Sequence, residues 1–277
     1  MAAGPAHSSH DVEWSAPVER SIVLASTPRC GSSLLSTAMR RTRKLGRPFE
    51  FCGRDALREL RARFPDQDLA GAFAELVKRR ISRNGVFCNK LHFHDALAFG
   101  DFDAMRAAHP NPVFVLLTRD DQLGQALSLA RAVQTHQWQA GLQGNGREAV
   151  YDADLIEGCL RFVVATASAW RFELAKRDLP WIELEHERTA ADLPAAVRRV
   201  AAAAGVALDD DDIKTEAALQ RQNTLGREDP WRIRFVAEAG AAWGFEIPTV
   251  PGAAPPPRRR GARVADALRR LADRISP

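Results

Sequence analysis

The chain has 277 residues, of which 45% are hydrophobic, and it carries a formal net charge of +4. This length and apolar content allow one large domain with a sizeable core. A surface that stacks nucleic-acid bases needs aromatic side chains interleaved with basic ones. The few excess basic residues of this chain are not arranged in that way, so we expect no nucleic-acid partner. The four cysteines show no CxxC pairing and no clustering with histidines at zinc spacing, so we expect neither disulfides nor a metal site.

Residues 1–20 are predicted to form a flexible N-terminal arm. Residues 1–17 are mostly small and polar and lack the apolar core of a signal peptide. No stretch of the sequence approaches the length and hydropathy of a membrane span. Because unpaired cysteines also fit a reducing compartment, we expect a cytoplasmic protein.

The first regular elements in chain order are a strand, a loop and a helix. Residues 21–25, Ser-Ile-Val-Leu-Ala, form a short apolar run typical of a strand that is buried on both faces. A polar loop occupies residues 26–33, and a helical pattern follows over residues 34–39. This order indicates the start of an α/β fold.

Similar patterns recur along the chain. Further strands are predicted at residues 85–88, 113–117 and 181–184. Helices are predicted within residues 55–83 and at residues 122–138 and 153–176. This alternation predicts the α/β fold class, with a parallel sheet flanked by helices. The last third is predicted to be an α-rich C-terminal cap, with helices around residues 192–204, 211–220 and 231–240.

The C-terminal segment, residues 248–277, is predicted to be a separate element after a main domain of residues 21–247. Residues 248–257 form a Pro/Gly/Ala linker. Apolar residues then recur at helical spacing on a basic background, namely Val264, Leu268, Leu271 and Ile275. We expect a basic amphipathic helix, either docked on its own domain or in peripheral contact with an anionic membrane.

The loop at residues 26–33 has the features of an anion site. A loop that turns from a buried strand into a helix presents unpaired N–H groups and the positive end of the helix dipole. Here Gly31 allows close backbone approach, and Ser32 and Ser33 add hydroxyls. Helix capping explains the serines but gives no reason for Arg29, which adds a permanent cation. We therefore predict a bound phosphate or sulfate group at this loop.

The loop does not match the Walker A pattern of metal-dependent kinases. It has one glycine, Gly31, and a serine follows where that pattern requires lysine. Asp120 and Asp121 follow a predicted strand, but they lie beside Arg119 and make a poor magnesium site. A metal-dependent nucleotide or small-molecule kinase stays as an alternative function. A non-catalytic nucleotide-binding scaffold is a second alternative.

Two motifs resemble the sulfotransferases that use 3′-phosphoadenosine 5′-phosphosulfate (PAPS). Residues 27–33, Thr-Pro-Arg-Cys-Gly-Ser-Ser, are similar to their 5′-phosphosulfate loop, with a cysteine where serine is usual. Residues 118–128 are similar to their 3′-phosphate element, in which an arginine at a strand end is followed by a serine. Further segments resemble the bacterial trehalose 2-sulfotransferase family, at residues 46–51, 125–138 and 221–235. The resemblance runs from residue 21 to residue 235.

The resemblance implies a P-loop-like fold and direct in-line transfer of a sulfuryl group to a hydroxyl of a carbohydrate or glycolipid acceptor. PAPS is then the donor, 3′-phosphoadenosine 5′-phosphate (PAP) is the product, no metal takes part, and the protein is a homodimer. The residues implied to hold the donor are Arg29, Cys30, Gly31, Ser32 and Ser33 at its 5′ end, Arg119 and Ser128 at its 3′-phosphate, and Arg221 over the nucleotide.

Two residues compete for the role of general base. Glu50 matches the position of the base in the trehalose enzymes. Lys90-Leu91-His92 resembles the catalytic lysine and histidine of animal cytosolic sulfotransferases. That match makes His92 the rival base and Lys90 a group that stabilises the leaving oxygen. The sequence leaves the choice between Glu50 and His92 open.

Residues 184–187 depart from the family pattern, because they lack the tyrosine often found before the glutamate. We expect Glu185 or Glu187 to hold a helix or an arginine. A single donor has to bridge the loop at Gly31 and the guanidinium of Arg119, so these two strand ends must lie together.

Overall fold

The computed structural model describes residues 5–12, 14, 16–138, 143–213 and 226–239. These residues fall into two compact units, the first made of residues up to 122 and 163–213, the second of residues 123–162 and 226–239. Arg221 and the linker and amphipathic helix expected over residues 248–277 lie outside the described residues. Among the described helices, none is both long and apolar enough to cross a bilayer.

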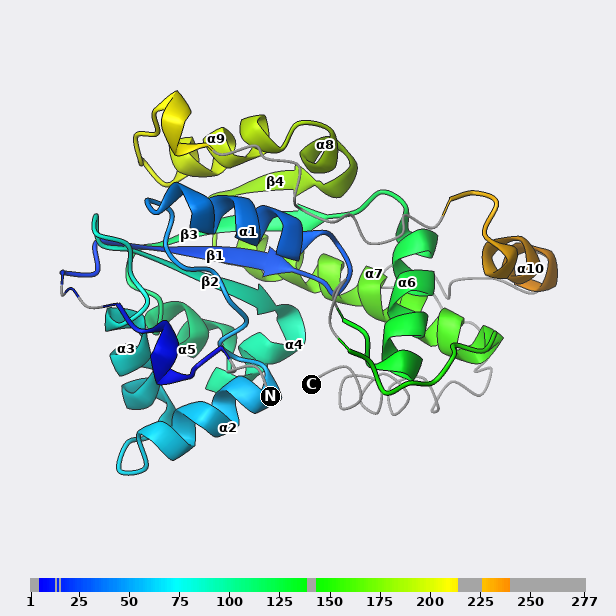
Figure 1. The fold of residues 1–277 in the computed structure, drawn as a ribbon, viewed down its shortest axis with the longest axis horizontal. Helices are drawn as coiled ribbons and strands as arrows, with labels where there is room; N and C mark the ends of the chain where they lie inside the picture. Colours follow the sequence, from blue (N-terminus) through cyan, green and yellow to red (C-terminus); the bar gives the residue numbers. More distant parts are fainter. Residues whose placement is uncertain (1–4, 13, 15, 139–142, 214–225, 240–277) are drawn as a thin grey trace, which may run out of the picture. The chain divides into compact units, whose positions relative to one another are not determined.

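The first unit is built around a four-stranded sheet (Figure 1). Its strands are β1 (Arg20–Ser26), β2 (Val86–His92), β3 (Pro112–Thr118) and β4 (Trp181–Glu185). They run in the order β2-β1-β3-β4 and every neighbouring pair is parallel, which confirms the predicted α/β fold class. In a parallel sheet the carboxyl ends of all strands meet at one edge. The polar residues that end these strands are therefore brought together.

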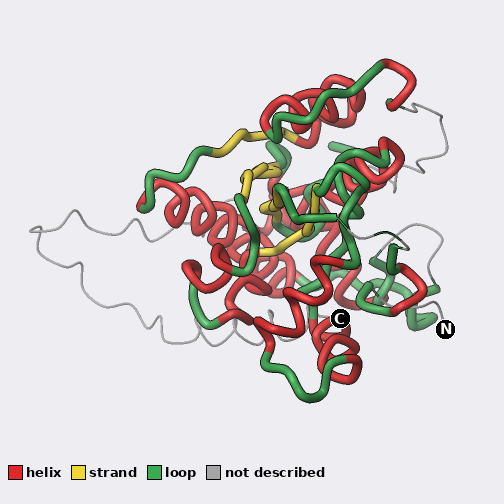
Figure 2. The backbone as a smooth tube through the Cα atoms, turned by 90° about the vertical axis from the view of Figure 1, so that its left-hand side faces the viewer, coloured by secondary structure: helices red, strands yellow, loops and turns green. Residues whose placement is uncertain are grey.

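Helices cover both faces of this sheet. The helices of the first unit are α1 (Ser32–Thr42), α2 (Arg54–Arg63), α3 (Leu69–Lys78), α4 (Phe93–Ala96), α5 (Phe102–Ala107), α8 (His186–Ala191) and α9 (Leu193–Ala203), with short 3₁₀ turns at Ser8–His10, Leu97–Phe99 and Asp210–Asp212. In Figure 1, α1 and α9 lie on one side of the strands, and α3 and α5 lie on the other. The strands, yellow in Figure 2, run between red helices.

Two apolar clusters form on the two faces of the sheet, because successive side chains of a strand point to opposite faces. Val23 and Ala25 of β1 pack on one face with buried residues of α2, α3, α5 and the second part of α7 (Ala153–Lys176). Ile22 and Leu24 pack on the other face with α1 and α9. All four side chains are fully buried, which fixes the end of β1 and the loop that follows it.

The described residues of the N-terminal arm have defined contacts, whereas the sequence predicts a flexible segment. Arg80 is fully buried and pairs with the carboxylate of Asp11, which also pairs with Arg63. Arg80 donates a further hydrogen bond of 2.7 Å to the carbonyl of His7. A buried guanidinium needs such acceptors. The arm supplies them, and Ala6 joins the core beside it.

The second unit contains α6 (Gln122–Thr135), the first part of α7, and α10 (Pro230–Ala239). Arg131 of α6 donates from Nη2 to both carboxylate oxygens of Asp229, at 3.0 and 2.9 Å. Its guanidinium also lies 4.0 Å from the ring centroid of Trp231. The Tyr151 hydroxyl donates to Glu238 at 2.7 Å. These contacts join α10 to the rest of the second unit.

Candidate functional site

The loop between β1 and α1 adopts a conformation that depends on Gly31. Both Arg29 and Gly31 have positive φ, at +67° and +84°, and Gly31 is the N-cap residue of α1. A Cβ on Gly31 would lie 2.1 Å from Nδ1 of His186. Glycine is therefore required twice, for the left-handed backbone and for the close approach of an imidazole. The N-terminus of α1 keeps its N–H groups available for an anion, because Gly31 provides no side-chain cap.

The side chains of the loop point in different directions. Cys30 is fully buried and belongs to the apolar cluster beneath α1, so its thiol serves packing. Ser32 is also buried, whereas Ser33 is exposed. Ser33 accepts a 3.1 Å hydrogen bond from Nζ of Lys90. The loop is thereby linked to the end of β2.

Arg119, at the end of β3, reaches the same loop. Its Nη1 donates to the carbonyl of Arg29 at 3.3 Å, and its side chain is only 10% exposed. Burial and the nearby charge of Arg119 lower the pKa of Arg29 to about 10. Two guanidinium groups that repel each other in a partly buried place are stabilised by an anion between them. The geometric condition for a single bridging donor is therefore met at the strand ends of β1 and β3.

Glu187 positions Arg119 and the chain that follows it. Its two carboxylate oxygens accept backbone N–H groups of Asp120 and Asp121, at 3.2 and 3.3 Å. The same carboxylate lies 3.8 Å from Nε of Arg119. These contacts confirm the expectation that a glutamate of this segment holds an arginine. Glu185 pairs instead with the exposed Arg188.

Glu50, Lys90 and His92, the three residues proposed for catalysis from sequence, form one cluster. The N–H of Lys90 donates to the carbonyl of Phe49 at 2.9 Å, so the segment before α2 runs beside β2. Oε1 of Glu50 lies 2.6 Å from Nζ of Lys90 and 3.2 Å from Nε2 of His92. The other ring nitrogen of His92 lies 3.0 Å from the hydroxyl of Ser26. The two rival bases are thus neighbours, and both ring nitrogens of His92 have partners.

The electrostatics of this cluster favour a charged Glu50. Burial alone raises the pKa of Glu50, but the charge of Lys90 and the hydrogen bond from His92 outweigh it and hold the pKa well below its usual range. Burial, together with the charge of His92, lowers the pKa of the neighbouring His94 to about 3. Burial raises the pKa of Asp95 to about 7. Glu50 is therefore the carboxylate of this cluster that is held in its ionised form, and its side chain is 30% exposed.

The structure does not test the predicted roles of two of the donor residues. Ser128 lies on α6 in the second unit, so its predicted role at the 3′-phosphate stays a prediction. Arg221 lies outside the described residues, and its role stays a prediction as well. One site residue was missed from sequence, namely His186 beside Gly31. The available signal was its position directly after a strand, which His186 shares with Arg119.

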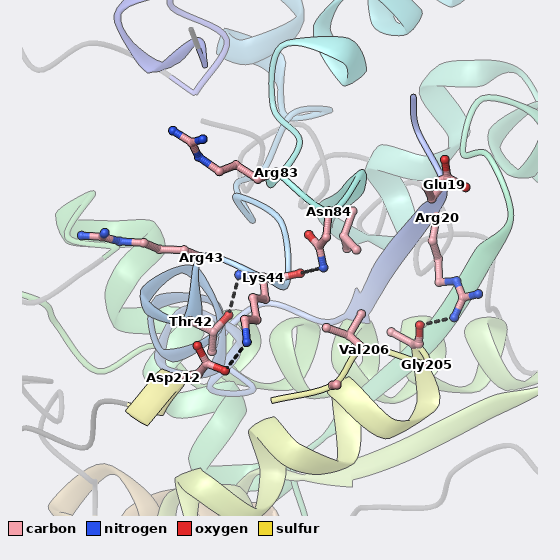
Figure 3. A pocket seen from close by; sticks show the side chains of 13 residues that line it. Glu19, Arg20, Thr42, Arg43, Lys44, Arg83, Asn84, Gly205, Val206 and Asp212 are labelled. Atoms are coloured by element: carbon pink, nitrogen blue, oxygen red, sulfur yellow. Dashed lines mark hydrogen bonds and ion pairs between the residues drawn. The ribbon is translucent and has the colours of Figure 1, made fainter. Parts of the chain in front are cut away.

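A separate pocket of about 630 Å³ lies at the opposite, amino-terminal edge of the sheet (Figure 3). Its lining includes the basic residues Arg20, Arg43, Lys44 and Arg83. Arg20 donates a hydrogen bond to the carbonyl of Ala204, just after α9. Nζ of Lys44 lies 2.6 Å from Oδ2 of Asp212. Helices α1 and α9 both end here, and their negative dipole ends disfavour an anion. We therefore assign the functional site to the carboxyl edge.

The model of the family described as Stf0 sulphotransferase matches residues 21–238. Trehalose 2-sulfotransferase of Mycobacterium tuberculosis (strain ATCC 35801 / TMC 107 / Erdman) is 29% identical over 259 residues, which covers 79% of this chain and 96% of that protein. Among solved structures, the sulfotransferase domain from the curacin biosynthetic pathway covers 94% of this chain and 99% of its own, with 10% identity and a TM-score of 0.46. The sulfotransferase STF1 of Mycobacterium tuberculosis H37Rv covers 70% of each chain, with 12% identity and a TM-score of 0.40.

Proposed function

Because the chain belongs to the Stf0 sulphotransferase family, we propose that it transfers a sulfuryl group from PAPS to a hydroxyl of a carbohydrate or glycolipid acceptor. The family match confirms the resemblance indicated by the sequence motifs, and it makes the chain a sulfotransferase. The donor, the acceptor class and the in-line mechanism are the proposal.

The convergence of Arg29 and Arg119 on the loop at Gly31 is the observation that carries the proposal. Both cations are largely withdrawn from water, and the N-terminus of α1 adds N–H groups to them. Guanidinium groups bind phosphate and sulfate oxygens in pairs of parallel hydrogen bonds. A donor with phosphate at one end and phosphosulfate at the other supplies the anions that this arrangement needs.

Glu50 is the residue that we propose as general base. Lys90 and His92 both contact its Oε1, and Oε2 forms no hydrogen bond or ion pair with a described residue. Oε2 is therefore available to take the proton of an acceptor hydroxyl, and 30% of the Glu50 side chain is exposed. His92 has no free ring nitrogen for this task, because Ser26 and Glu50 engage both of them. In this assignment His92 orients the base.

The proposed step balances without a covalent enzyme intermediate. The acceptor oxygen attacks sulfur in line as its proton passes to Glu50, and the bond between sulfur and the bridging phosphate oxygen breaks. The products are a sulfate ester and PAP. Lys90 contacts both Glu50 and Ser33, so its ammonium is near enough to the loop to stabilise the negative charge on the departing phosphate. A donor on the loop also draws the ammonium from Glu50 and thereby strengthens the base.

The acceptor class rests on the relative, which is a trehalose 2-sulfotransferase by name. We propose a carbohydrate or glycolipid, with trehalose as the first compound to test. A related fold can serve several acceptors with one donor site, so the acceptor needs a direct assay. The expected homodimer and cytoplasmic location also stay predictions.

The decisive experiment measures transfer of ³⁵S from labelled PAPS to trehalose, other sugars and lipid extracts, with EDTA present. The wild-type protein is expected to label at least one acceptor, and PAP is expected to raise its melting temperature without Mg²⁺. The Arg119→Ala variant serves as the donor-site control and is expected to lose the PAP shift. Absence of a shift at saturating PAP, or Mg²⁺-dependent phosphate transfer from ATP instead, would overturn the proposal in favour of a scaffold or a kinase.

A further inference from the structure

The end of a third strand, β4, also reaches the loop at Gly31. Thr118 of β3 pairs in register with Glu185 of β4, so the residues that follow them, Arg119 and His186, leave the sheet side by side. His186 is the first residue of α8, and its ring packs against the backbone of Gly31. The carboxyl ends of β1, β3 and β4 therefore converge around the N-terminus of α1.

The imidazole of His186 is incompletely satisfied in this position. Its Nδ1 is buried, and it has no hydrogen-bond partner among the described residues. Nδ1 is also the ring atom that lies nearest to the place where a Cβ on Gly31 would be. A buried polar atom without a partner costs free energy, about 1 to 3 kcal/mol in typical proteins. Such an atom beside a loop built for an anion indicates a ligand contact.

The surroundings of His186 set the form in which it binds. Burial and the charge of Arg119 lower the pKa of His186, so the ring is neutral at neutral pH. A neutral imidazole carries one N–H, and an anion beside Nδ1 selects the tautomer with that proton on Nδ1. The neutral ring therefore gives the loop a further hydrogen-bond donor. It does so without a third positive charge beside those of Arg29 and Arg119.

We propose that His186 is a donor-binding residue whose Nδ1–H donates a hydrogen bond to the 5′-phosphate end of PAPS at the Gly31 loop. This inference rests on the proposed function, because it names a further residue for the same donor. It assigns His186 to the 5′ end, because its ring lies against Gly31, which the proposed function places at the 5′-phosphosulfate.

The test compares variants that keep or remove a donor at the Nδ1 position. His186→Asn places an amide N–H close to Nδ1, whereas His186→Leu fills a similar volume without a polar atom. Titration calorimetry with PAP is expected to give a Kd about tenfold to a hundredfold weaker for His186→Leu, as loss of a hydrogen bond to a charged group predicts. His186→Asn is expected to recover most of this loss. Thermal melting without ligand checks that both variants are folded.

Two mononucleotides separate a direct contact from a general defect. Adenosine 5′-monophosphate should show the same loss in His186→Leu as PAP does, whereas adenosine 3′-monophosphate should bind wild type and variant alike. Equal PAP affinity in folded wild type and His186→Leu would overturn the inference, and so would an equal loss with the 3′-monophosphate. If the wild-type protein does not bind PAP, the proposed function itself fails, which is a different outcome.

Discussion

The ammonium nitrogen of Lys90 lies 2.6 Å from the same carboxylate oxygen of Glu50 that His92 contacts. Two residues of β2 thus hold one oxygen of the proposed base, and the proposed mechanism uses the other oxygen for the acceptor. Lys90 and His92 are separated by one residue, so they point to the same face of the strand. The pair therefore belongs to a single arrangement that serves Glu50.

The first prediction concerns the pH dependence of turnover. The charge of Lys90 is the main influence that holds the pKa of Glu50 down against the effect of burial. Replacing Lys90 by Ala removes this charge, so the pKa of Glu50 rises and a larger fraction of the carboxylate is protonated at a given acid pH. The acid limb of the kcat/KM profile is expected to move to higher pH, in addition to a fall in kcat. Lys78→Ala, in an exposed pair with Glu75, should leave the profile unchanged.

The second prediction separates the base from its orienting residue. Glu50→Gln is expected to lower kcat about 100-fold to 10,000-fold, as loss of a general base does, with the Kd for PAP nearly unchanged. His92→Gln should retain much of the activity, because its amide reaches the Nε2 position and can still donate to Glu50. A base cannot be replaced by an amide. Single-turnover rates that fall equally in His92→Gln and Glu50→Gln would instead make His92 the base.

The third prediction concerns the glycine of the loop. Gly31→Ala places a side chain on a backbone with positive φ, and the added Cβ would clash with the ring of His186. The strained backbone alone costs about 1 to 3 kcal/mol. The matched control is Gly100→Ala, where φ is +100° and no atom lies within 4 Å of the added Cβ. Gly31→Ala is expected to melt at a lower temperature than Gly100→Ala and to bind PAP more weakly. Adding His186→Ala to Gly31→Ala should restore the steric part of the lost stability, and the absence of any recovery would argue against the packing described.

The sheet was predictable from the sequence where its strands are apolar. The run at residues 21–25 and the loop after it correspond to β1 and the start of α1, because both depend on local patterns. Strand β2 was predicted only as far as residue 88, but it continues to His92. Asn89, Lys90 and His92 are buried polar residues, and their burial depends on partners such as Glu50 and Ser26 that are distant in sequence.

The position of His186 could not be derived from local sequence for a related reason. Its contact with Gly31 follows from the strand order, which places the end of β4 beside the end of β3. A weak, half-exposed strand gives no indication of its neighbour. Arg119 was singled out because it directly follows the strongly apolar run of β3, in a motif that resembles the 3′-phosphate element of the sulfotransferases.

The last prediction concerns the stability of the first unit. Arg80 is fully buried, and its main partner is Asp11, which is 23% exposed and also pairs with Arg63. Burial raises the pKa of Asp11, but the hydrogen bonds from Arg63 and Arg80 outweigh it and lower the pKa below its usual value. Asp11 therefore stabilises the fold above the pKa that it has in the unfolded chain, and this contribution disappears as the pH falls through its lower pKa in the folded protein.

Asp11→Ala leaves the guanidinium of Arg80 buried without its carboxylate, which typically costs about 3 kcal/mol or more. Urea denaturation at neutral pH should show this loss, and the difference from wild type should shrink toward acid pH. Asp55→Ala is the matched control, because Asp55 forms an exposed pair with Arg58 and should change the free energy of unfolding by less than about 0.5 kcal/mol. If Asp11→Ala and Asp55→Ala were equally stable at neutral pH, the N-terminal segment would not be held by Arg80 in solution.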